Sequence, residues 1–366
     1  MFLITIINFT YILIILVDSI IGKGQFSIVK VCSKGVVPPD SYLDSIPFVK
    51  GESSRKPFAS KTAVKIIPKS EVYTIQAVLR IEHEIKILRK LGPHKNIIDY
   101  RDCLHGEKNV YIFTECYPMD LFDFIERFKA VINENIVAVI TREILLAVEH
   151  MKSYRIVHRD LKPENILVAI DNSSISVKLC DFGLAVCLPE DSSRLTDFCG
   201  SPGFFAPEVL LSDSYCAYKS EIFSVGCVVL ELLVSDSFFK EQWLHCYSQL
   251  KTTKAPDFSR AIRHALTTAQ VEVQKKYSQH LSDCYVNMTN ILPTARPISK
   301  ELLNNPWISK ANSLHAADIL HGKEPRKLIS LHIPEINSIS PQNLKRITDV
   351  RATPVKVNYR SYYCSY

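Results

Sequence analysis

The sequence predicts an α+β fold of two lobes, with a small strand-rich N-terminal lobe and a larger helical C-terminal lobe. Two observations lead to this prediction. Runs of β-branched and aromatic residues, separated by Gly, Pro and Ser, fill much of the first third of the chain. From Leu121 onward, apolar residues recur at helical spacing. The 366 residues, 47% of them hydrophobic, suffice for one large or two modest domains with a real core.

Charge and cysteine content narrow the class of protein. The net charge of +6 is spread along the chain without a long block of one sign, and this mild excess argues neither for nor against nucleic-acid binding. We expect no nucleic-acid partner. The eleven cysteines are scattered without a Cys-x-x-Cys pair, which indicates neither a zinc site nor a disulfide framework. This pattern favours a reducing compartment, the cytoplasm or the nucleus.

The chain begins with a hydrophobic N-terminal stretch that has no charged side chain before Asp18. It lacks the basic region and cleavage site of a secretory signal, and residues 1–17 are at the lower limit for crossing a bilayer. A glycine turn that begins at Gly22 needs a strand before it. We therefore expect a strand from about Thr10 to Ile21, preceded by a hydrophobic extension at 1–11. A membrane anchor and an incorrect chain start remain alternatives.

The following elements complete the N-terminal lobe. Ile28, Val29 and Val31 favour a second strand after the turn. Residues 35–58, rich in Pro, Ser and Gly, indicate an inserted surface loop. The remaining patterns predict strands at 62–68 and 109–115 and an amphipathic helix at 71–91, with Ile81, Ile85 and Leu88 on its apolar side.

Helical patterns dominate the rest of the chain. We expect helices at 120–132, 135–156 and 220–235. The lobes are then expected at about 12–115 and 121–309, joined by a hinge at about 116–120. Past Trp307 the periodicity fades, and residues 311–366 carry eight Lys and Arg against four Asp and Glu. Residues 310–366 are therefore expected to form a weakly ordered basic tail, which is either a docking or autoinhibitory segment or solvated filler.

Several residues suit the transfer of a phosphoryl group, which requires charge neutralisation, metal ions and an oriented hydroxyl. Gly22 and Gly24 let the backbone approach phosphates, with Ser27 in the third glycine position of a G-x-G-x-x-G pattern. Lys65 supplies a cation, and Glu84, nineteen residues later, can pair with it. Taken alone, these residues are weak signals.

The stretch HRDLKPEN, His158 to Asn165, is a stronger signal. Asp160 offers a carboxylate to accept a hydroxyl proton, Lys162 a cation for the moving group, and Asn165 an amide oxygen for a metal ion. The DFG run adds the carboxylate of Asp181, and APE follows at residues 206–208.

These motifs, in this order, resemble the eukaryotic protein kinase family. The matching elements are GKGQFSIV, AVK, HRDLKPEN, DFG, APE and the late Arg296, and they span about residues 12–309. The resemblance implies the two-lobed protein-kinase-like fold, ATP and Mg²⁺ as cofactors, and protein substrates. The loop HRDLKPEN, with Lys162, resembles that of the serine/threonine branch. The run TDFCGSPGFFAPE resembles that of calmodulin-dependent and AMP-activated kinases.

The resemblance also implies roles for individual positions. Asp160 would be the catalytic base, Lys162 would stabilise the transferred group, and Asn165 and Asp181 would hold Mg²⁺. His158, Glu208 and Arg296 would be structural, and Thr114 would be the gatekeeper. The residues implied to bind the nucleotide are Ile21, Gly22, Lys23, Gly24, Gln25, Phe26, Ser27, Val29, Ala63, Lys65, Glu84, Glu115 and Tyr117. Glu164 and Asp120 would meet a basic residue upstream of the phosphoacceptor, which gives a weak preference for basic flanking residues.

The sequence departs from the family pattern in two places. SEIFSVG replaces the usual D-x-W-S-x-G, so Glu221 stands where an Asp normally anchors the catalytic loop, and we regard that anchor as uncertain. Asp197 occupies the position of the usual activation-loop threonine, next to Thr196. Asp197 then supplies a permanent negative charge for Arg159, or Thr196 is phosphorylated in a loop shifted by one residue.

Three functions are compatible with these motifs. The first is an active ATP-dependent serine/threonine kinase. The second is a catalytically weak pseudokinase scaffold, although such proteins usually lack one of the residues present here as Lys65, Asp160 and Asp181. The third is a small-molecule phosphotransferase, which generally lacks APE and the long segment before it.

Overall fold

The computed structural model describes residues 2–8, 11–23, 28–36, 62–72, 74–106, 108–170, 174–248 and 255–313. Most of the expected insertion at 35–58 lies outside these residues, as does nearly all of the expected tail at 310–366. The turn residues Gly24, Gln25, Phe26 and Ser27 also lie outside them.

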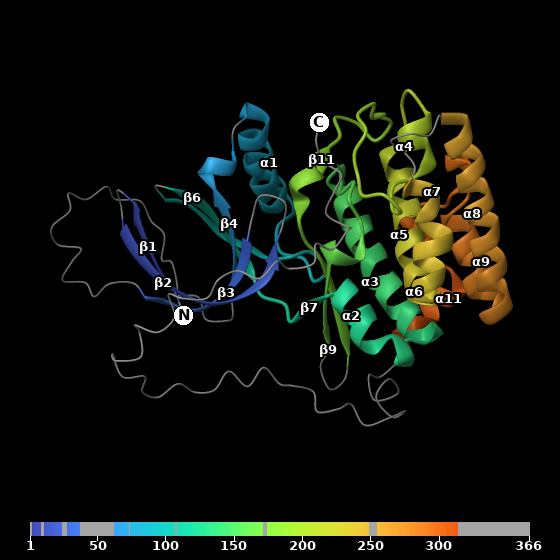
Figure 1. Cartoon of the computed structure of the whole chain (residues 1–366), viewed down its shortest axis with the longest axis horizontal. Coiled ribbons are helices and arrows are strands. Elements are labelled where there is room, and N and C mark those ends of the chain that lie inside the picture. Colours follow the sequence, from blue (N-terminus) through green and yellow to red (C-terminus); the bar gives the residue numbers. More distant parts are fainter. Residues whose placement is uncertain are drawn as a thin grey trace.

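A six-stranded antiparallel sheet forms the N-terminal lobe, with strand order β1-β2-β3-β4-β6-β5 (Figure 1). Two of the strands match the sequence prediction to the residue, at 62–68 and 109–115. The strands are β1 (Phe2–Asn8), β2 (Tyr11–Lys23), β3 (Ile28–Val36), β4 (Thr62–Pro68), β5 (Tyr100–His105) and β6 (Asn109–Glu115).

The hydrophobic N-terminus forms a hairpin in this sheet. β2 covers the strand expected at about Thr10 to Ile21, and β1 pairs with it from Phe2 opposite Val17 to Asn8 opposite Tyr11. The apolar run thus supplies sheet strands. Among the helices of the described chain, none is both long and apolar enough to pass through a bilayer.

Helix α1 (Ile75–Leu91) begins four residues later than the sequence indicates. Residues 69–71 form a short 3-10 turn after Pro68, and the Thr74 side chain then accepts the Ala77 backbone N–H and caps the helix. Strand β5 was not predicted, because YRDCLH buries only Leu104 and has no β-branched residue.

The C-terminal lobe is mainly helical (Figure 1). Its longer helices are α2 (Leu121–Phe128), α3 (Glu134–Ser153), α5 (Ala217–Leu233), α8 (Ala255–Lys276) and α9 (Gln279–Met288). Shorter ones are α4 (Pro207–Leu211), α6 (Asp236–Phe238), α7 (His245–Ser248), α10 (Ser299–Leu303) and α11 (Pro306–Ser309). Every residue from Glu221 to Leu233 is buried, so α5 lies in the core of this lobe.

Short strands position the chemistry-bearing loops where the lobes meet. They form two small sheets, one of β7 (Met119–Asp120), β9 (Ile166–Ile170) and β10 (Ile175–Leu179), and one of β8 (Ile156–Val157) and β11 (Val186–Cys187). HRDLKPEN connects β8 to β9, and DFG connects β10 to β11. Because both loops begin and end in small paired strands, their polar side chains are held close together.

Candidate active site

The loop between β8 and β9 brings Asp160, Lys162 and Asn165 into contact. The Lys162 ammonium lies 3.0 Å from Asp160 Oδ2. Asn165 Nδ2 donates to the Asp160 carboxylate at 3.0 Å and to the Asp160 carbonyl at 2.8 Å. These contacts fix the Asp160 carboxylate, and the neighbouring carboxylate raises the pKa of Lys162 against the opposing effect of its burial.

A hydroxyl from the chain itself also lies at this carboxylate. Ser201 Oγ donates to Asp160 Oδ1 at 2.7 Å and accepts from Lys162 Nζ at 2.7 Å. The segment reaches this position through Gly200, whose φ of +110° suits glycine and where an added Cβ would lie 3.1 Å from the Arg159 carbonyl. A hydroxyl group therefore fits between this carboxylate and this ammonium.

Lys65 joins the two lobes electrostatically. Its ammonium lies 2.9 Å from Glu84 Oε2 of α1 and 3.0 Å from Asp181 Oδ1, next to β10. The charge of Lys65 lowers the pKa of Asp181 to about 2, and the desolvation of the carboxylate only partly offsets this effect. The Asp181 carboxylate is therefore ionised at neutral pH. The sheet, helix α1 and the DFG loop thus meet at one ammonium group.

Asp181 and Asn165 have side chains that suit Mg²⁺. Magnesium prefers oxygen ligands, and it is usually held by one or two protein carboxylates together with phosphates and water. Asp181 offers an ionised carboxylate and Asn165 an amide oxygen. Asn165 is the last residue of the catalytic loop, and its backbone carbonyl accepts the N–H of Cys180, the residue before Asp181, at 3.0 Å.

The sheet presents the other residues expected around a nucleotide. Gly22 pairs with Val29, and Val29 pairs with Lys65 in the adjacent strand. Ala63 is buried and lies opposite Thr114. Ile21 and Lys23 lie at the end of β2, before the residues outside the described part.

The hinge residues have side-chain contacts that the sequence did not indicate. The Glu115 carboxylate lies 2.7 Å from the Lys178 ammonium and also accepts the Asp99 backbone N–H. The Tyr117 hydroxyl contacts Ser176 Oγ at 3.5 Å. These contacts fasten the connection between the lobes to β10.

His158 has a structural position. Its ring is fully buried, packs on Phe182 at 4.9 Å between ring centroids, and bonds the Cys180 carbonyl through Nε2 at 2.9 Å. Burial lowers the pKa of His158, so the imidazole is neutral. The ring therefore ties the catalytic loop to the DFG loop.

Arg159 and Asp181 both have positive φ, 67° and 59°, which is unfavourable for residues other than glycine. Contacts on each residue hold this conformation in place. The Arg159 guanidinium donates to the Leu184 carbonyl at 2.7 Å and contacts Asp197 Oδ2 at 2.5 Å. Arg159 therefore connects the catalytic loop with the start of the segment that follows DFG and with its later part at Asp197.

Glu221 of α5 lies beneath the catalytic loop. Its Oε1 accepts the His158 backbone N–H at 2.5 Å. The anchor that the sequence left uncertain is thus made by the longer side chain. The next residue but one, Phe223, packs under the Arg296 guanidinium, 4.8 Å from its ring centroid.

Glu208 and Arg296 form a buried ion pair. Arg296 NH1 and NH2 lie 2.5 and 2.8 Å from the two carboxylate oxygens of Glu208. Arg296 also donates to the carbonyls of Asn290 and Lys219. The pair joins the end of the segment after DFG to the last helices of the lobe.

Asp120 and Glu164 form an acidic pair beside the loop. Asp120 Oδ1 caps α2 by accepting the Asp123 N–H at 2.7 Å. Burial, with added repulsion from Asp123 and Glu164, raises the pKa of Asp120 to about 6. Within the described residues, Glu164 Oε2 is buried without a hydrogen-bond partner.

Ser201 is the residue of this site that sequence reasoning missed. The only available signal was its place in CGSPG, five residues before APE, because nothing local indicates a contact with a loop forty residues earlier. The Lys178–Glu115 pair was missed for the same reason.

Comparison with known proteins assigns the family. The family model of the protein kinase domain matches residues 53–308. A CDPK-related kinase 5 of Arabidopsis thaliana is 31% identical over 293 residues, which are 80% of this chain and 43% of that protein. The calcium/calmodulin-dependent protein kinase type II alpha chain of Drosophila melanogaster is 30% identical over 306 residues, 83% of this chain and 50% of that protein.

A probable serine/threonine-protein kinase CCRP1 of Zea mays is 31% identical over 254 residues, 69% of this chain and 38% of that protein. The chain thus spans between 38% and 50% of the length of these relatives. The matched region contains the catalytic loop, DFG, APE and Arg296 together with the contacts described above. The chain therefore belongs to the protein kinase family, in its serine/threonine branch.

Proposed function

We propose that this chain transfers the γ-phosphoryl group of ATP to serine and threonine hydroxyls of protein substrates. The observation that carries the proposal is the position of Lys65, within 3.0 Å of both Glu84 and Asp181. This arrangement joins a phosphate-binding cation to a metal-binding carboxylate beside the loop that carries Asp160. Lys65, Asp160 and Asp181 are all present and mutually positioned, which argues against the pseudokinase alternative.

In this proposal, Asp160 accepts the proton of the substrate hydroxyl as that oxygen attacks phosphorus. The contact of Ser201 Oγ with Asp160 Oδ1 at 2.7 Å supports the ability of this carboxylate to receive a hydroxyl proton. Lys162, 3.0 Å from the same carboxylate, neutralises charge on the phosphoryl oxygens. Lys65 binds the α- and β-phosphates, and Ile21 to Ser27, Val29, Ala63, Glu115 and Tyr117 surround the nucleotide.

Asn165 and Asp181 would hold Mg²⁺ in this proposal. When bound by these two side chains, the ion would supply positive charge to the phosphate oxygens. The low pKa of Asp181 supports this role, because an ionised carboxylate is available across the physiological range.

The finer part of the proposal concerns the substrate. Asp120 and Glu164 offer negative charge at the catalytic loop, and the partly exposed Glu164 carboxylate would pair with an arginine or lysine of the substrate. We expect protein substrates with a basic residue upstream of the phosphoacceptor.

The test is phosphate transfer from Mg-ATP to an arrayed peptide library by the bacterially expressed chain and its Asp160→Asn variant. Loss of the general base is expected to lower kcat by about 10²–10⁴-fold. Asp257→Asn, which changes an exposed carboxylate of α8 paired only with Arg260 among the contacts described, serves as the matched control. Equal transfer by the wild type and Asp160→Asn, or no transfer by the wild type with ATP bound, would overturn the proposal.

A further inference from the structure

Glu221 is buried in an unusual way for a carboxylate. It is 3% exposed, on a helix whose following residues are all buried. Its Oε1 accepts the His158 N–H at 2.5 Å, and within the described residues its Oε2 has no hydrogen-bond partner. A buried carboxylate oxygen without a donor is costly in its ionised form.

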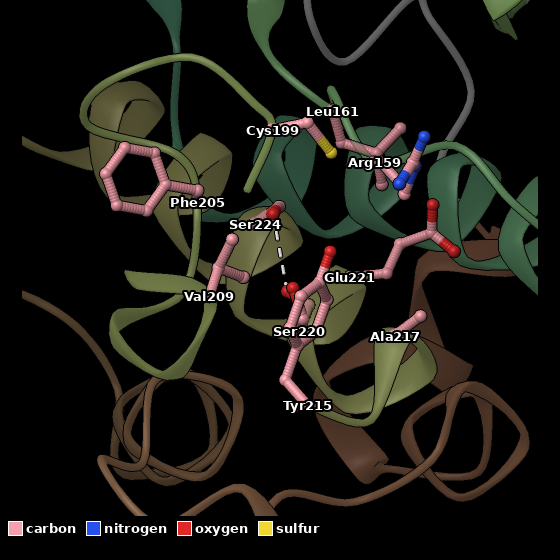
Figure 2. Close-up of a pocket in the computed structure, with 10 residues that line it drawn as sticks. All are labelled: Arg159, Leu161, Cys199, Phe205, Val209, Tyr215, Ala217, Ser220, Glu221 and Ser224. Carbon is pink, nitrogen blue, oxygen red and sulfur yellow. Dashed lines mark hydrogen bonds between the residues drawn. The ribbon is translucent and has the colours of Figure 1, made fainter. Parts of the chain in front are cut away.

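Several polar side chains near Glu221 bond other groups. A cavity of about 10 Å³, close to the minimum for one water molecule, lies beside it between α5 and the segment before APE (Figure 2). Two of the hydroxyls that line it are engaged elsewhere: the Tyr215 hydroxyl donates to the Asp197 carbonyl, and Ser224 Oγ donates to the Ser220 carbonyl. The Arg159 guanidinium is bonded to Asp197 and to the Leu184 carbonyl.

We infer that Glu221 is a proton-sensitive positioning residue: its ionised carboxylate holds the catalytic loop in place, and protonation at mildly acid pH loosens that hold. The expected effect on kcat rests on the proposed function. The effect of protonation on the hydrogen bond to the His158 amide does not depend on it. That effect depends on the hydrogen bond from the His158 amide to Oε1 and on the second carboxylate oxygen, which has no partner within the described residues.

The charged and titratable groups that face Glu221 come from three segments. The catalytic loop presents the backbone N–H groups of His158 and Arg159 and the Arg159 guanidinium, all of which favour the ionised carboxylate. The segment before APE adds Cys199, Tyr215 follows it, and Tyr218 lies on α5 itself. Burial outweighs the favourable groups and raises the pKa of Glu221 to about 7.

The sign of the effect on the loop follows from the hydrogen bond. Above about pH 7, Glu221 is ionised and accepts the His158 N–H as a charge-assisted bond, roughly twice as strong as a neutral one. As the pH falls through about 7, the carboxylate takes up a proton and the bond becomes a weaker, neutral one. Asp160 lies two residues after His158, so its position loses support in acid.

The effect on stability has the opposite sign. The folded-state pKa of Glu221 lies above the ordinary glutamate value of 4.5, so the folded chain binds this proton more tightly than the unfolded chain. The contribution of Glu221 to the free energy of unfolding is therefore full below about pH 4.5. It is lost as the pH rises to about 7. A residue with a merely structural role would change stability and activity in the same direction.

The first test is kcat and KM from pH 5.5 to 8.5 for the wild type, Glu221→Gln and Glu221→Asp. We expect the wild-type kcat to fall on the acid side with a midpoint near pH 7 and KM for ATP to change little. Glu221→Gln should show a kcat about tenfold lower at pH 8 without that acid limb, yet a higher Tm. Glu221→Asp, which keeps the charge, should retain most of the kcat at pH 8.

A wild-type acid limb that persists in Glu221→Gln, or a kcat of Glu221→Gln equal to the wild type at pH 8, would overturn the inference. The second test needs neither activity nor a variant: hydrogen exchange of the His158 and Arg159 amides, expressed as protection factors. Protection should fall severalfold from pH 8 to pH 6, and unchanged protection contradicts the inference. Absence of phosphate transfer at every pH would reject the proposed function and leave this second test decisive.

Discussion

Two arginine–carboxylate pairs in this chain differ in what surrounds them. Arg296 and Glu208 are 0% and 7% exposed, with two parallel contacts of 2.5 and 2.8 Å. Arg159 and Asp197 are 15% and 58% exposed, with one contact of 2.5 Å. In the first pair, each buried charge is compensated by the other. In the second pair, water can solvate the Asp197 carboxylate without the arginine, and only Arg159 is largely buried.

This difference in burial indicates that the Arg296–Glu208 pair stabilises the fold, whereas the Arg159–Asp197 pair controls activity. A charge of the first kind is shielded from water, so removal of its partner leaves an uncompensated charge in the core. Asp197 is solvated in either state, so its contact with Arg159 adds little to stability. The contact instead sets the position of the segment after DFG relative to the catalytic loop, because Arg159 also bonds the Leu184 carbonyl.

The largest expected effect comes from breaking the buried pair. Arg296→Leu should lower the free energy of unfolding by about 3–5 kcal/mol, because Glu208 is left buried and unpaired. Thermal melting of the purified chain measures this change. Arg296→Lys, which keeps the charge but loses the two-point contact, should be affected less.

The double variant Arg296→Leu with Glu208→Leu is the control for this prediction. Removing both charges should cost less than removing Arg296 alone. If the double variant melts below the single variant, the cost is one of packing and not of an unpaired carboxylate.

A smaller effect, confined to activity, is expected from the exposed pair. Asp197→Ala should lower kcat about three- to tenfold and change the free energy of unfolding by less than about 0.5 kcal/mol. Asp197→Glu should preserve activity, since the negative charge remains. Phosphate transfer by bacterially expressed, unphosphorylated protein measures both.

The alternative, phosphorylation of exposed Thr196, makes the reverse prediction. Under the permanent-charge hypothesis, Thr196→Ala leaves the rate unchanged. Loss of activity in Thr196→Ala together with full activity in Asp197→Ala would end that hypothesis and identify Thr196 as the site of control.

The smallest effect is expected at the acidic pair beside the loop. Glu164→Gln should raise KM about three- to fivefold for a peptide with an upstream arginine, because a partly exposed charge contact is worth little. KM for a peptide with alanine at that place should not change. Glu126→Gln, an exposed glutamate of α2, is the matched control, and equal KM changes for the two peptides would contradict the proposed preference.

The fold class followed from the sequence because periodicity and motif order are local properties. The strands at 62–68 and 109–115 were predicted to the residue, since each is rich in β-branched or aromatic residues. β5 and the two small sheets of the C-terminal lobe were not predicted, because short segments such as Ile156–Val157 become strands only through a distant partner. Helices α8 and α9 also lacked a specific prediction.

The chemistry of the site was visible in residue types, but its contacts were not. Asp160, Lys162 and Asn165 are close in sequence, so their proximity could be expected. The contacts of Ser201 with Asp160 and of Glu221 with the His158 amide join segments 41 and 63 residues apart. Such distances are set by the packing of α5 and the segment before APE, which no local pattern encodes.

The Arg159–Asp197 contact also bears on how long a signal lasts. A phosphate on a hydroxyl is added by one enzyme and removed by another, so its lifetime is set by their balance. A carboxylate is made when the chain is translated and cannot be removed by a phosphatase. If Asp197 is the only anion that Arg159 requires, the output of this kinase follows the number of chains in the cell, and it ends when those chains are degraded.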